Sequence, residues 1–185
     1  MKKPEWRVRS SSYIVDSAFL RLRKDEIELP DGTVVEDYYV RESPGFVMIF
    51  PITADGDVVI TRQYRYASDA IHLELPAGML DAGEDPLDCA RRELFEETGY
   101  EAECFTLLGT FFAEPVRSTS RAYLFIAHNA RKKGEQMLDP TEHIDVEHIP
   151  VVELSAMLRE GKIDSLSSVG AIYLALDMLK NHSAS

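Results

Sequence analysis

The sequence predicts a mixed α+β fold, an α/β/α sandwich preceded by a small antiparallel β-sheet. Strand-forming and helix-forming segments follow one another out of strict alternation, which favours such an architecture. The 185 residues suffice for one domain with an accessory segment, and a chain of this length buries roughly 70% of its unfolded surface. Apolar residues make up 45% and charged residues 28%, as in compact globular proteins.

The first part of the chain carries the signals for the small sheet. Three stretches are rich in strand formers, and a Pro-Asp-Gly sequence at 30–32 supplies a hairpin turn between the second and the third. These stretches are residues 6–15, 19–29 and 33–41. We expect a domain boundary near Gly45, with residues 1–44 as an N-terminal β domain and residues 45–185 as a second domain.

The second domain begins with a predicted hairpin. Residues 46–50 and 58–62 flank a turn sequence at 54–57, and the apolar first segment indicates a buried strand. Further strands are expected later in the chain, at residues 105–112, 122–127 and 144–150. Two helices are expected after them, one ending before Gly161 and one around residues 172–179.

One more helix has a signal at each end. Asp85 suits the N-cap, Pro86 suits the first helical position, and Gly99 supplies a C-terminal stop. Apolar residues recur between them at helical spacing and predict one buried stripe, formed by Leu87, Ala90 and Leu94.

Composition argues against several classes of protein. The net charge of −12 would repel a phosphate backbone, so we expect no nucleic-acid partner. No apolar run reaches the roughly 20 residues of a membrane span, and no signal-peptide pattern opens the chain. We therefore expect a cytoplasmic protein without a membrane partner. Cys89 and Cys104 form no CxxC pair and are interpreted as reduced, packed thiols, and the histidines lack a zinc-ligand spacing.

The acidic residues of the capped helix carry the strongest chemical signal. Glu93, Glu96 and Glu97 lie at positions i, i+3 and i+4, so their carboxylates converge on one side of the helix. A solvated helix face is the structural alternative. However, hard divalent cations such as magnesium require carboxylate oxygens in such a cluster. We expect an exposed metal site there.

The surrounding segment resembles the box of the Nudix hydrolase family, G-x5-E-x7-R-E-U-x-E-E-x-G-U, where U is a bulky apolar residue. The matching residues are Gly78, Glu84, Arg92, Glu93, Leu94, Glu96, Glu97 and Gly99. Seven strict positions coincide by chance about once in several hundred million starting points at average residue usage. Tyr100 is a minor departure from the box, because an aliphatic residue is more usual at that position.

This resemblance implies a magnesium-binding loop-helix-loop, with manganese as a possible substitute. It implies that Glu93, Glu96 and Glu97 are metal ligands, and similarity to ADP-ribose pyrophosphatases adds the Ala77 carbonyl. Arg92 and Glu84 are expected to form an ion pair that orients the loop and the ligands. Structural roles are expected for the glycines of the box, where Gly78 permits a tight backbone approach and Gly99 ends the helix.

Flanking segments resemble one branch of the family. Residues 72–78, His-Leu-Glu-Leu-Pro-Ala-Gly, resemble the lead-in to the box in ADP-ribose pyrophosphatases and nucleotide-sugar hydrolases. Residues 62–66 resemble the same group of enzymes, in which an arginine at the position of Arg65 contacts the substrate. Arg62 is a second candidate for substrate binding. A surface charge is the alternative for each arginine.

The loop after the box departs from the branch. Pro115 keeps the proline of that group, but the residues after it lack the usual glycine and acid. The basic residues Arg117 and Arg121 would then meet a terminal phosphate or a different sugar, or remain solvated loop charges.

A catalytic carboxylate is expected further along the chain. Residues 138–144 resemble the mobile loop that supplies a glutamate in ADP-ribose pyrophosphatases, and Glu142 aligns with it. An ordinary loop acid is the alternative, with Glu135 and Asp139 as rival candidates. The predicted catalytic set is therefore Glu142, Glu96 and Arg92.

The sequence thus predicts magnesium-dependent hydrolysis of a nucleoside diphosphate derivative, with ADP-ribose giving AMP and ribose 5-phosphate as the leading reaction. GDP-mannose or UDP-sugar hydrolysis is one alternative, and a non-catalytic Nudix protein that binds a nucleotide sugar is another. Similar enzymes exchange the N-terminal sheet between two subunits, and so small a sheet has poor independent stability. We therefore expect a homodimer, with residues 1–44 as the dimerisation segment.

Overall fold

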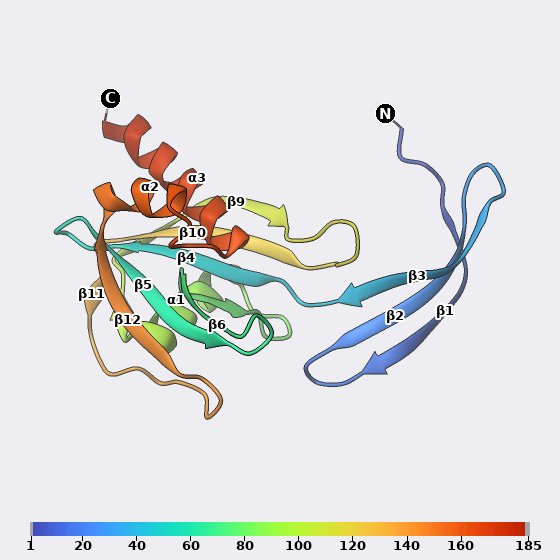
Figure 1. The fold of residues 1–185 in the computed structure, drawn as a ribbon, viewed down its shortest axis with the longest axis horizontal. Helices are drawn as coiled ribbons and strands as arrows, with labels where there is room; N and C mark the ends of the chain where they lie inside the picture. The colour runs from blue at the N-terminus through green and yellow to red at the C-terminus, as the bar shows by residue number, and fades with distance from the viewer. Residues whose placement is uncertain (1, 184–185) are drawn as a thin grey trace. The chain divides into compact units, whose positions relative to one another are not determined.

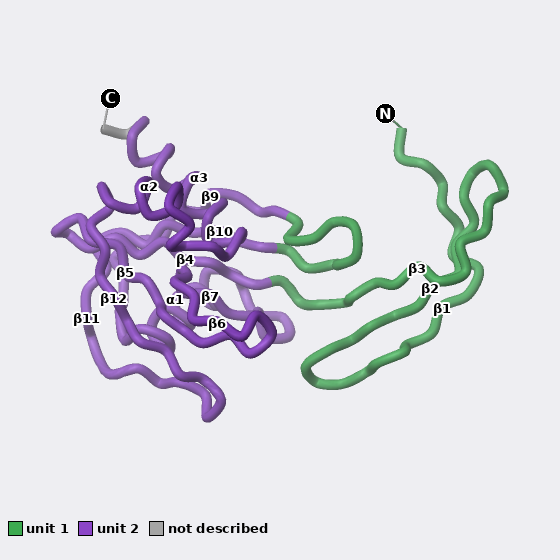
Figure 2. Tube along the Cα trace, in the orientation of Figure 1, with its two compact units in different colours: residues 1–45, 112–121 green, residues 46–111, 122–185 purple. Residues whose placement is uncertain are grey.

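The computed structural model describes residues 2–183 and divides into two compact units. Unit 1 comprises residues 1–45 and 112–121, and unit 2 comprises residues 46–111 and 122–185 (Figure 2). Residues 112–121 were not part of the N-terminal domain that the sequence suggested.

Unit 1 contains an antiparallel sheet of three strands in the order β1-β2-β3. The strands are β1 (Arg7–Asp16), β2 (Arg21–Glu28) and β3 (Val34–Glu42). Gly32 closes the β2–β3 turn with a φ of 85° and donates its N–H to the Leu29 carbonyl, which is the hairpin predicted there. Segment 112–121 joins the unit because the Tyr38 hydroxyl donates to the Val116 carbonyl at 2.7 Å. Every residue of β1 is exposed.

Unit 2 is built on a mixed sheet with the order β12-β5-β4-β10-β9, with β6 added beside β5 and β7 beside β4 (Figure 1). Its strands are β4 (Phe46–Ile52), β5 (Asp57–Arg65), β6 (Ala70–Glu74), β7 (Ala77–Met79), β9 (Cys104–Phe112), β10 (Arg121–His128) and β12 (Ile144–Pro150). Strands β4 and β10 run parallel, whereas β5 pairs with β12 and β6 in antiparallel fashion. A short pair, β8 (Tyr100–Glu101) and β11 (Arg131–Lys132), lies outside this sheet.

Helices cover both faces of this sheet, as the sandwich requires. Alternate side chains of a strand point to opposite faces. Met48 and Phe50 of β4 accordingly pack with α2 (Val151–Arg159) and α3 (Leu166–Ser183), whereas Val47 and Ile49 pack with α1 (Pro86–Thr98). The predicted stripe of α1 lies in this second core, where Ala90 and Leu94 are fully buried. The predicted fold class is confirmed.

Four short strands, β6, β7, β8 and β11, were not predicted from the sequence, and two of them lie beside the acidic helix in the chain. Strands β6 and β7 are five and three residues long, and Pro76 interrupts the stretch between them. Neither length allows a clear alternation of polar and apolar residues. They matter because they lead directly from β5 to the acidic helix. Within residues 2–183, no helix is long and apolar enough to cross a membrane.

Candidate active site

Helix α1 forms where its end signals predicted it. The Asp85 carboxylate accepts the Leu87 N–H at 2.8 Å, Pro86 occupies the first turn, and Gly99 ends the helix with a left-handed φ of 69°. A side chain at Gly99 would also collide with a neighbouring segment, because its Cβ would lie 2.2 Å from the Gly134 carbonyl oxygen. The caps therefore fix the helix register, and with it the positions of the glutamates.

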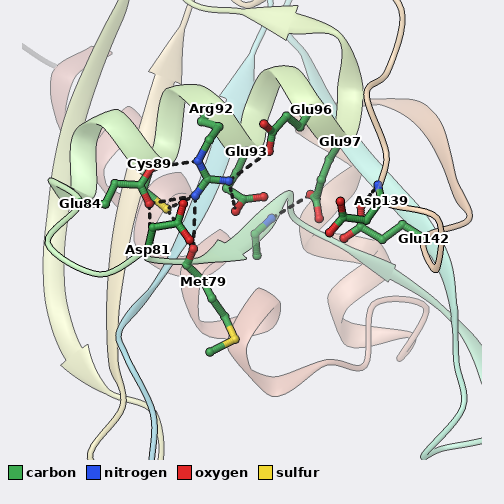
Figure 3. Close-up of polar contacts among 11 residues, drawn as sticks. Met79, Asp81, Glu84, Cys89, Arg92, Glu93, Glu96, Glu97, Asp139 and Glu142 are labelled. Carbon is green, nitrogen blue, oxygen red and sulfur yellow. Dashed lines mark hydrogen bonds and ion pairs between the residues drawn. The ribbon is translucent and has the colours of Figure 1, made fainter. Parts of the chain in front are cut away.

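The three box glutamates differ in their surroundings. Glu93 lies beside Gly78 and Glu97 beside Ala77, both residues of β7, whereas the Glu96 side chain is 37% exposed (Figure 3). Glu97 is only 6% exposed and accepts the Ala77 N–H at 3.0 Å, so the expectation of an exposed site is wrong for this residue. Its burial arises where α1 packs against β7, a long-range contact that helical spacing does not reveal.

Gly78 has a steric role beside Glu93. A Cβ at Gly78 would lie 1.8 Å from the Glu93 carboxyl carbon, so any side chain there would displace that carboxylate. The absence of a side chain lets Glu93 approach the β7 backbone directly. This is the close backbone approach that the sequence predicted for Gly78.

Arg92 connects the loop before the helix with the glutamates on it. Its Nε and one terminal nitrogen donate to the two oxygens of Glu84 at 2.8 and 2.9 Å, the predicted ion pair in a bidentate geometry. Its other terminal nitrogen contacts Glu93 at 2.7 Å and Glu96 at 3.0 Å (Figure 3). Glu84 also accepts the Asp81 N–H at 2.9 Å, which closes the loop.

Electrostatics distinguish these carboxylates. Hydrogen bonding from Arg92 lowers the pKa of Glu84 to about 2, so Glu84 is a stable anion. Burial raises the pKa of Glu93, and repulsion from Glu96 and Glu142 adds to that effect. Burial also raises the pKa of Glu97 to about 8, with repulsion from Glu93 and Glu142 acting in the same direction. The cluster therefore holds more negative charge than its surroundings stabilise.

This donor set suits a hard divalent cation. Carboxylate oxygens that are partly desolvated and repel one another gain most from a nearby cation. Within residues 2–183, however, no three acidic, cysteine or histidine side chains already converge into a formed metal-binding group. The chemistry of the donors fits a metal, while the carboxylates of Glu93 and Glu96 are drawn toward Arg92.

A second segment caps the C-terminal end of α1. The carbonyls of Glu96 and Glu97 accept hydrogen bonds from the Met137 N–H at 2.8 Å and the Gln136 amide at 2.6 Å. Gln136 also donates to the Ile144 carbonyl at 3.0 Å and so joins the two ends of loop 137–143. Sequence patterns did not single out this residue, because a lone glutamine in a loop belongs to no motif.

Loop 137–143 brings Glu142 to the cluster, as Figure 3 shows. The Glu142 charge acts on both Glu93 and Glu97, and its carboxylate accepts the Asp139 N–H at 3.0 Å. The structure thus brings Glu142 and its rival Asp139 together near the box glutamates. Glu135, the other rival, is an exposed residue outside this loop.

The two candidate arginines of β5 lie on opposite faces of the sheet. Arg62 pairs in register with Leu73, which packs toward α2 and α3, and its guanidinium contacts Asp145 at 3.4 Å. Arg65 lies on the α1 face, where Glu74 accepts a hydrogen bond from its Nε at 2.9 Å. Its positive charge offsets part of the rise that burial causes in the pKa of Glu97. Only Arg65 shares a face with the acidic cluster. The alternation of side chains along a strand would have placed Arg62 and Arg65 on opposite faces from the sequence alone.

The remaining candidate arginines belong to unit 1. Arg117 lines an open pocket of about 410 Å³ together with Leu22, Tyr39, Arg41 and Glu114. Arg121 stacks over the Phe112 ring, with the guanidinium carbon 4.0 Å from the ring centroid.

Comparisons with known proteins identify the family. A profile described as NUDIX domain matches residues 43–168, and one described as nucleoside diphosphate sugar hydrolase N-terminal domain matches residues 6–40. The chain therefore belongs to the Nudix family and is an enzyme of that family, which confirms the resemblance found in the sequence. Nudix hydrolases generally use divalent metal ions.

Several relatives match along most of the chain. The protein is 33% identical to the methanol dehydrogenase activator of Bacillus methanolicus, covering 96% of this chain and 97% of that protein. It is 28% identical to the ADP-ribose pyrophosphatase of Bacillus subtilis strain 168, with coverages of 95% and 96%. It is also 28% identical to a GDP-mannose pyrophosphatase of Yersinia enterocolitica, with coverages of 82% and 85%.

A solved structure supports the fold. A crystal structure of an ADP compounds hydrolase matches with a TM-score of 0.85, covering 98% of this chain and 97% of the other, at 22% identity. At that identity the likeness shows the fold alone.

Proposed function

We propose that this Nudix pyrophosphatase cleaves ADP-ribose between its two phosphates, giving AMP and ribose 5-phosphate. The observation that carries the proposal is the acidic cluster on α1 with Arg65 on the same face, because it offers carboxylates for cations and a guanidinium for phosphate oxygens. Relatives named ADP-ribose pyrophosphatase match more than nine-tenths of the chain, which favours this substrate.

Magnesium is the proposed cofactor, with manganese as a substitute. Glu93, Glu96 and Glu97 and the Ala77 carbonyl would hold it, since the three glutamates lie on one helix and the Ala77 N–H bonds the Glu97 carboxylate. When bound, the ion would neutralise the diphosphate and favour attack of water on phosphorus. Arg92 and Glu84 would keep the glutamates oriented through the contacts described above.

Glu142 is the proposed group that orients or deprotonates the attacking water. The box glutamates would be committed to the cation, so a separate carboxylate nearby is the better proton acceptor. Glu142 acts electrostatically on Glu93 and Glu97, and loop 137–143 carries it. Asp139 is the alternative on the same loop.

Substrate binding is assigned to three arginines. Arg65 would contact a phosphate oxygen, because it lies on the α1 face and Glu74 fixes its guanidinium. Arg62 and Arg117 remain proposed contacts to the rest of the substrate. Arg62 lies on the opposite face of the sheet and Arg117 belongs to unit 1, so their roles depend on loops or on a second subunit.

Sugar nucleotides are the second candidate substrates. The loop after Pro115 lacks the glycine and acid expected of an ADP-ribose enzyme, and GDP-mannose pyrophosphatases are among the relatives. An altered sugar or terminal group would fit this departure.

A homodimer is proposed as the working assembly, with residues 1–44 as the dimerisation domain and 45–185 as the catalytic domain. Strand β1 is exposed along its ten residues and forms one edge of a three-stranded sheet, which favours pairing with a second copy. Light scattering at micromolar concentration should give twice the chain mass of 20.9 kDa; the single-chain mass would reject the dimer.

Product analysis over a panel of nucleotides tests the function. With ADP-ribose and magnesium, AMP and ribose 5-phosphate should appear in equal amounts, and free phosphate should not be the first product. Chelation with EDTA should stop the reaction. Turnover of GDP-mannose or a UDP-sugar with ADP-ribose left intact would replace the leading substrate, and no turnover of any member of the panel would reject the function.

A further inference from the structure

Three polar side chains of unit 2 form a continuous hydrogen-bonded row beside β6. The carboxylate of Asp164, in the segment between α2 and α3, lies 2.6 Å from His72 Nδ1. His72 Nε2 lies 2.6 Å from the hydroxyl of Ser68. The Ser68 hydroxyl donates at 3.1 Å to the carbonyl of Arg65, so the row ends on the backbone of the arginine that faces the acidic cluster.

Proton counting distinguishes this row from a nucleophile with its base. The Ser68 hydroxyl has one proton; when that proton bonds the Arg65 carbonyl, the hydroxyl oxygen can only accept at His72 Nε2. A carboxylate accepts, so His72 Nδ1 donates to Asp164. An activated serine requires the opposite polarity, with an unprotonated nitrogen facing the hydroxyl.

The row stabilises the β5–β6 turn, which contains a residue in an unfavourable backbone conformation. Asp69, next to Ser68, has a left-handed φ of 52°, which is uncommon for a residue with a side chain. The Tyr64 hydroxyl donates to the Asp69 carboxylate at 2.9 Å, and the Ser68 N–H bonds the Arg65 carbonyl at 3.2 Å. The β5–β6 turn is therefore held by side chains on both sides, and its geometry sets where Arg65 leaves the strand.

The other end of the row is anchored in the core. Ile163, next to Asp164, is 1% exposed. Nearby, the fully buried Ser168 accepts the Leu75 N–H at 3.2 Å, so the start of α3 also fixes the chain just after β6. Asp164 thus sits on a rigid segment.

We propose that Asp164, His72 and Ser68 are positioning residues that hold Arg65 ready for a phosphate oxygen of the substrate. The inference rests on the proposed function, since it assumes that Arg65 contacts the diphosphate. Two restraints then act on Arg65 in different places: the row fixes its backbone carbonyl, and Glu74 fixes its guanidinium at 2.9 and 2.7 Å. The charged partner of His72 in this arrangement is Asp164.

Steady-state kinetics of His72→Gln, on whichever panel substrate the wild type turns over best, test the proposal. Glutamine cannot donate at both ends, so the row is broken. Because the Arg65 contact is made in the ground state as well as the transition state, KM should rise about tenfold while kcat stays within about twofold. Calorimetry without metal should show a similar loss of affinity for that substrate.

A double-mutant cycle separates positioning from general damage. In an Arg65→Ala background, His72→Gln should change KM by less than about twofold, because the residue it positions is gone. Asp164→Leu should behave like His72→Gln, while Asp164→Asn, which keeps the acceptor oxygen, should stay within about threefold of wild type. Lys162→Gln is the matched control on the same segment, where the ammonium pairs with Glu160 at 2.8 Å on the surface; its kinetics should be those of wild type.

Several outcomes would overturn the inference. An unchanged KM in His72→Gln would do so, as would an equal loss with and without Arg65. Labelling of Ser68 by a fluorophosphonate would show an activated serine instead. If His72→Gln folds poorly, Ser68→Ala, the smallest change, carries the same test. A wild type that neither binds nor cleaves any panel nucleotide defeats both proposals, whereas normal wild-type turnover with unaffected variants defeats this one alone.

Discussion

The ion pair between Glu84 and Arg92 should make a measurable contribution to stability. Glu84→Gln keeps the size of the side chain and one acceptor oxygen but removes the charge that two Arg92 nitrogens contact at 2.8 and 2.9 Å. The pKa of Glu84 falls from 4.5 to about 2, which sets an upper bound of about 3 kcal/mol at about 1.4 kcal/mol per unit. The side chains are 15% and 30% exposed, so solvent screening reduces the expected loss to about 1–2 kcal/mol.

The sign of the pH dependence follows from the direction of the shift. Because the folded state lowers the pKa of Glu84, the stabilisation is complete above about pH 4.5 and disappears as the pH falls toward about 2. Urea unfolding in EDTA at about pH 7 should therefore show the full difference between wild type and variant, with a melting temperature lower by about 3–6 °C. The difference should shrink as the pH is lowered below about 4.5.

A surface ion pair on the same helix provides the control. Asp88 and Arg91 lie 3.1 Å apart but are 70% and 58% exposed, so Asp88→Asn should change the unfolding free energy by less than about 0.5 kcal/mol. Equal effects of Asp88→Asn and Glu84→Gln would refute the reasoning. So would a Glu84→Gln loss that stays constant down to about pH 3.5, since a charge-independent packing defect behaves in that way.

Two further predictions concern the chemistry. Glu97→Gln keeps an acceptor for the Ala77 N–H but removes a charged ligand. Turnover should therefore fall at least about 100-fold, while the melting temperature measured without metal stays within about 2 °C of wild type. An unchanged rate and unchanged magnesium activation would remove Glu97 from the ligand set. Glu142→Gln should lower kcat by about 10²- to 10⁴-fold with little change in KM or magnesium affinity. If kcat falls less than about threefold while chemistry is rate-limiting, Glu142 does not have this role, and the candidates become Glu96, Glu114, Glu135 or Asp139.

Local signals predicted the acidic helix well. Asp85, Pro86 and Gly99 act on backbone groups that are close to them in sequence. Their effect can therefore be predicted from the local sequence, and the helix runs between them as expected. The spacing of Glu93, Glu96 and Glu97 placed the three on one helix for the same reason. Sequence proximity is sufficient wherever an interaction spans one helical turn.

Long-range pairing explains what the sequence did not reveal. The burial of Glu97 depends on β7, which is only three residues long and pairs with β4 some thirty positions earlier. The Gln136 amide donates hydrogen bonds to the carbonyls of Glu97 and Ile144. A single glutamine in the sequence does not predict those partners. Segment 112–121 joined unit 1 through contacts with β3, which likewise link distant residues.

The presence of Arg92 among the carboxylates proposed to bind metal has a physical explanation in this arrangement. Without a cation, Glu93 and Glu96 would repel each other, and the guanidinium of Arg92 offsets that repulsion through one nitrogen that contacts both. Each contact uses one oxygen of a carboxylate, so each glutamate keeps a second oxygen for a cation. Glu84 prevents Arg92 from moving further toward the cluster, because it holds two other guanidinium positions. If the cluster holds a cation as proposed, Glu84 would therefore limit how strongly Arg92 competes with that cation for Glu93 and Glu96.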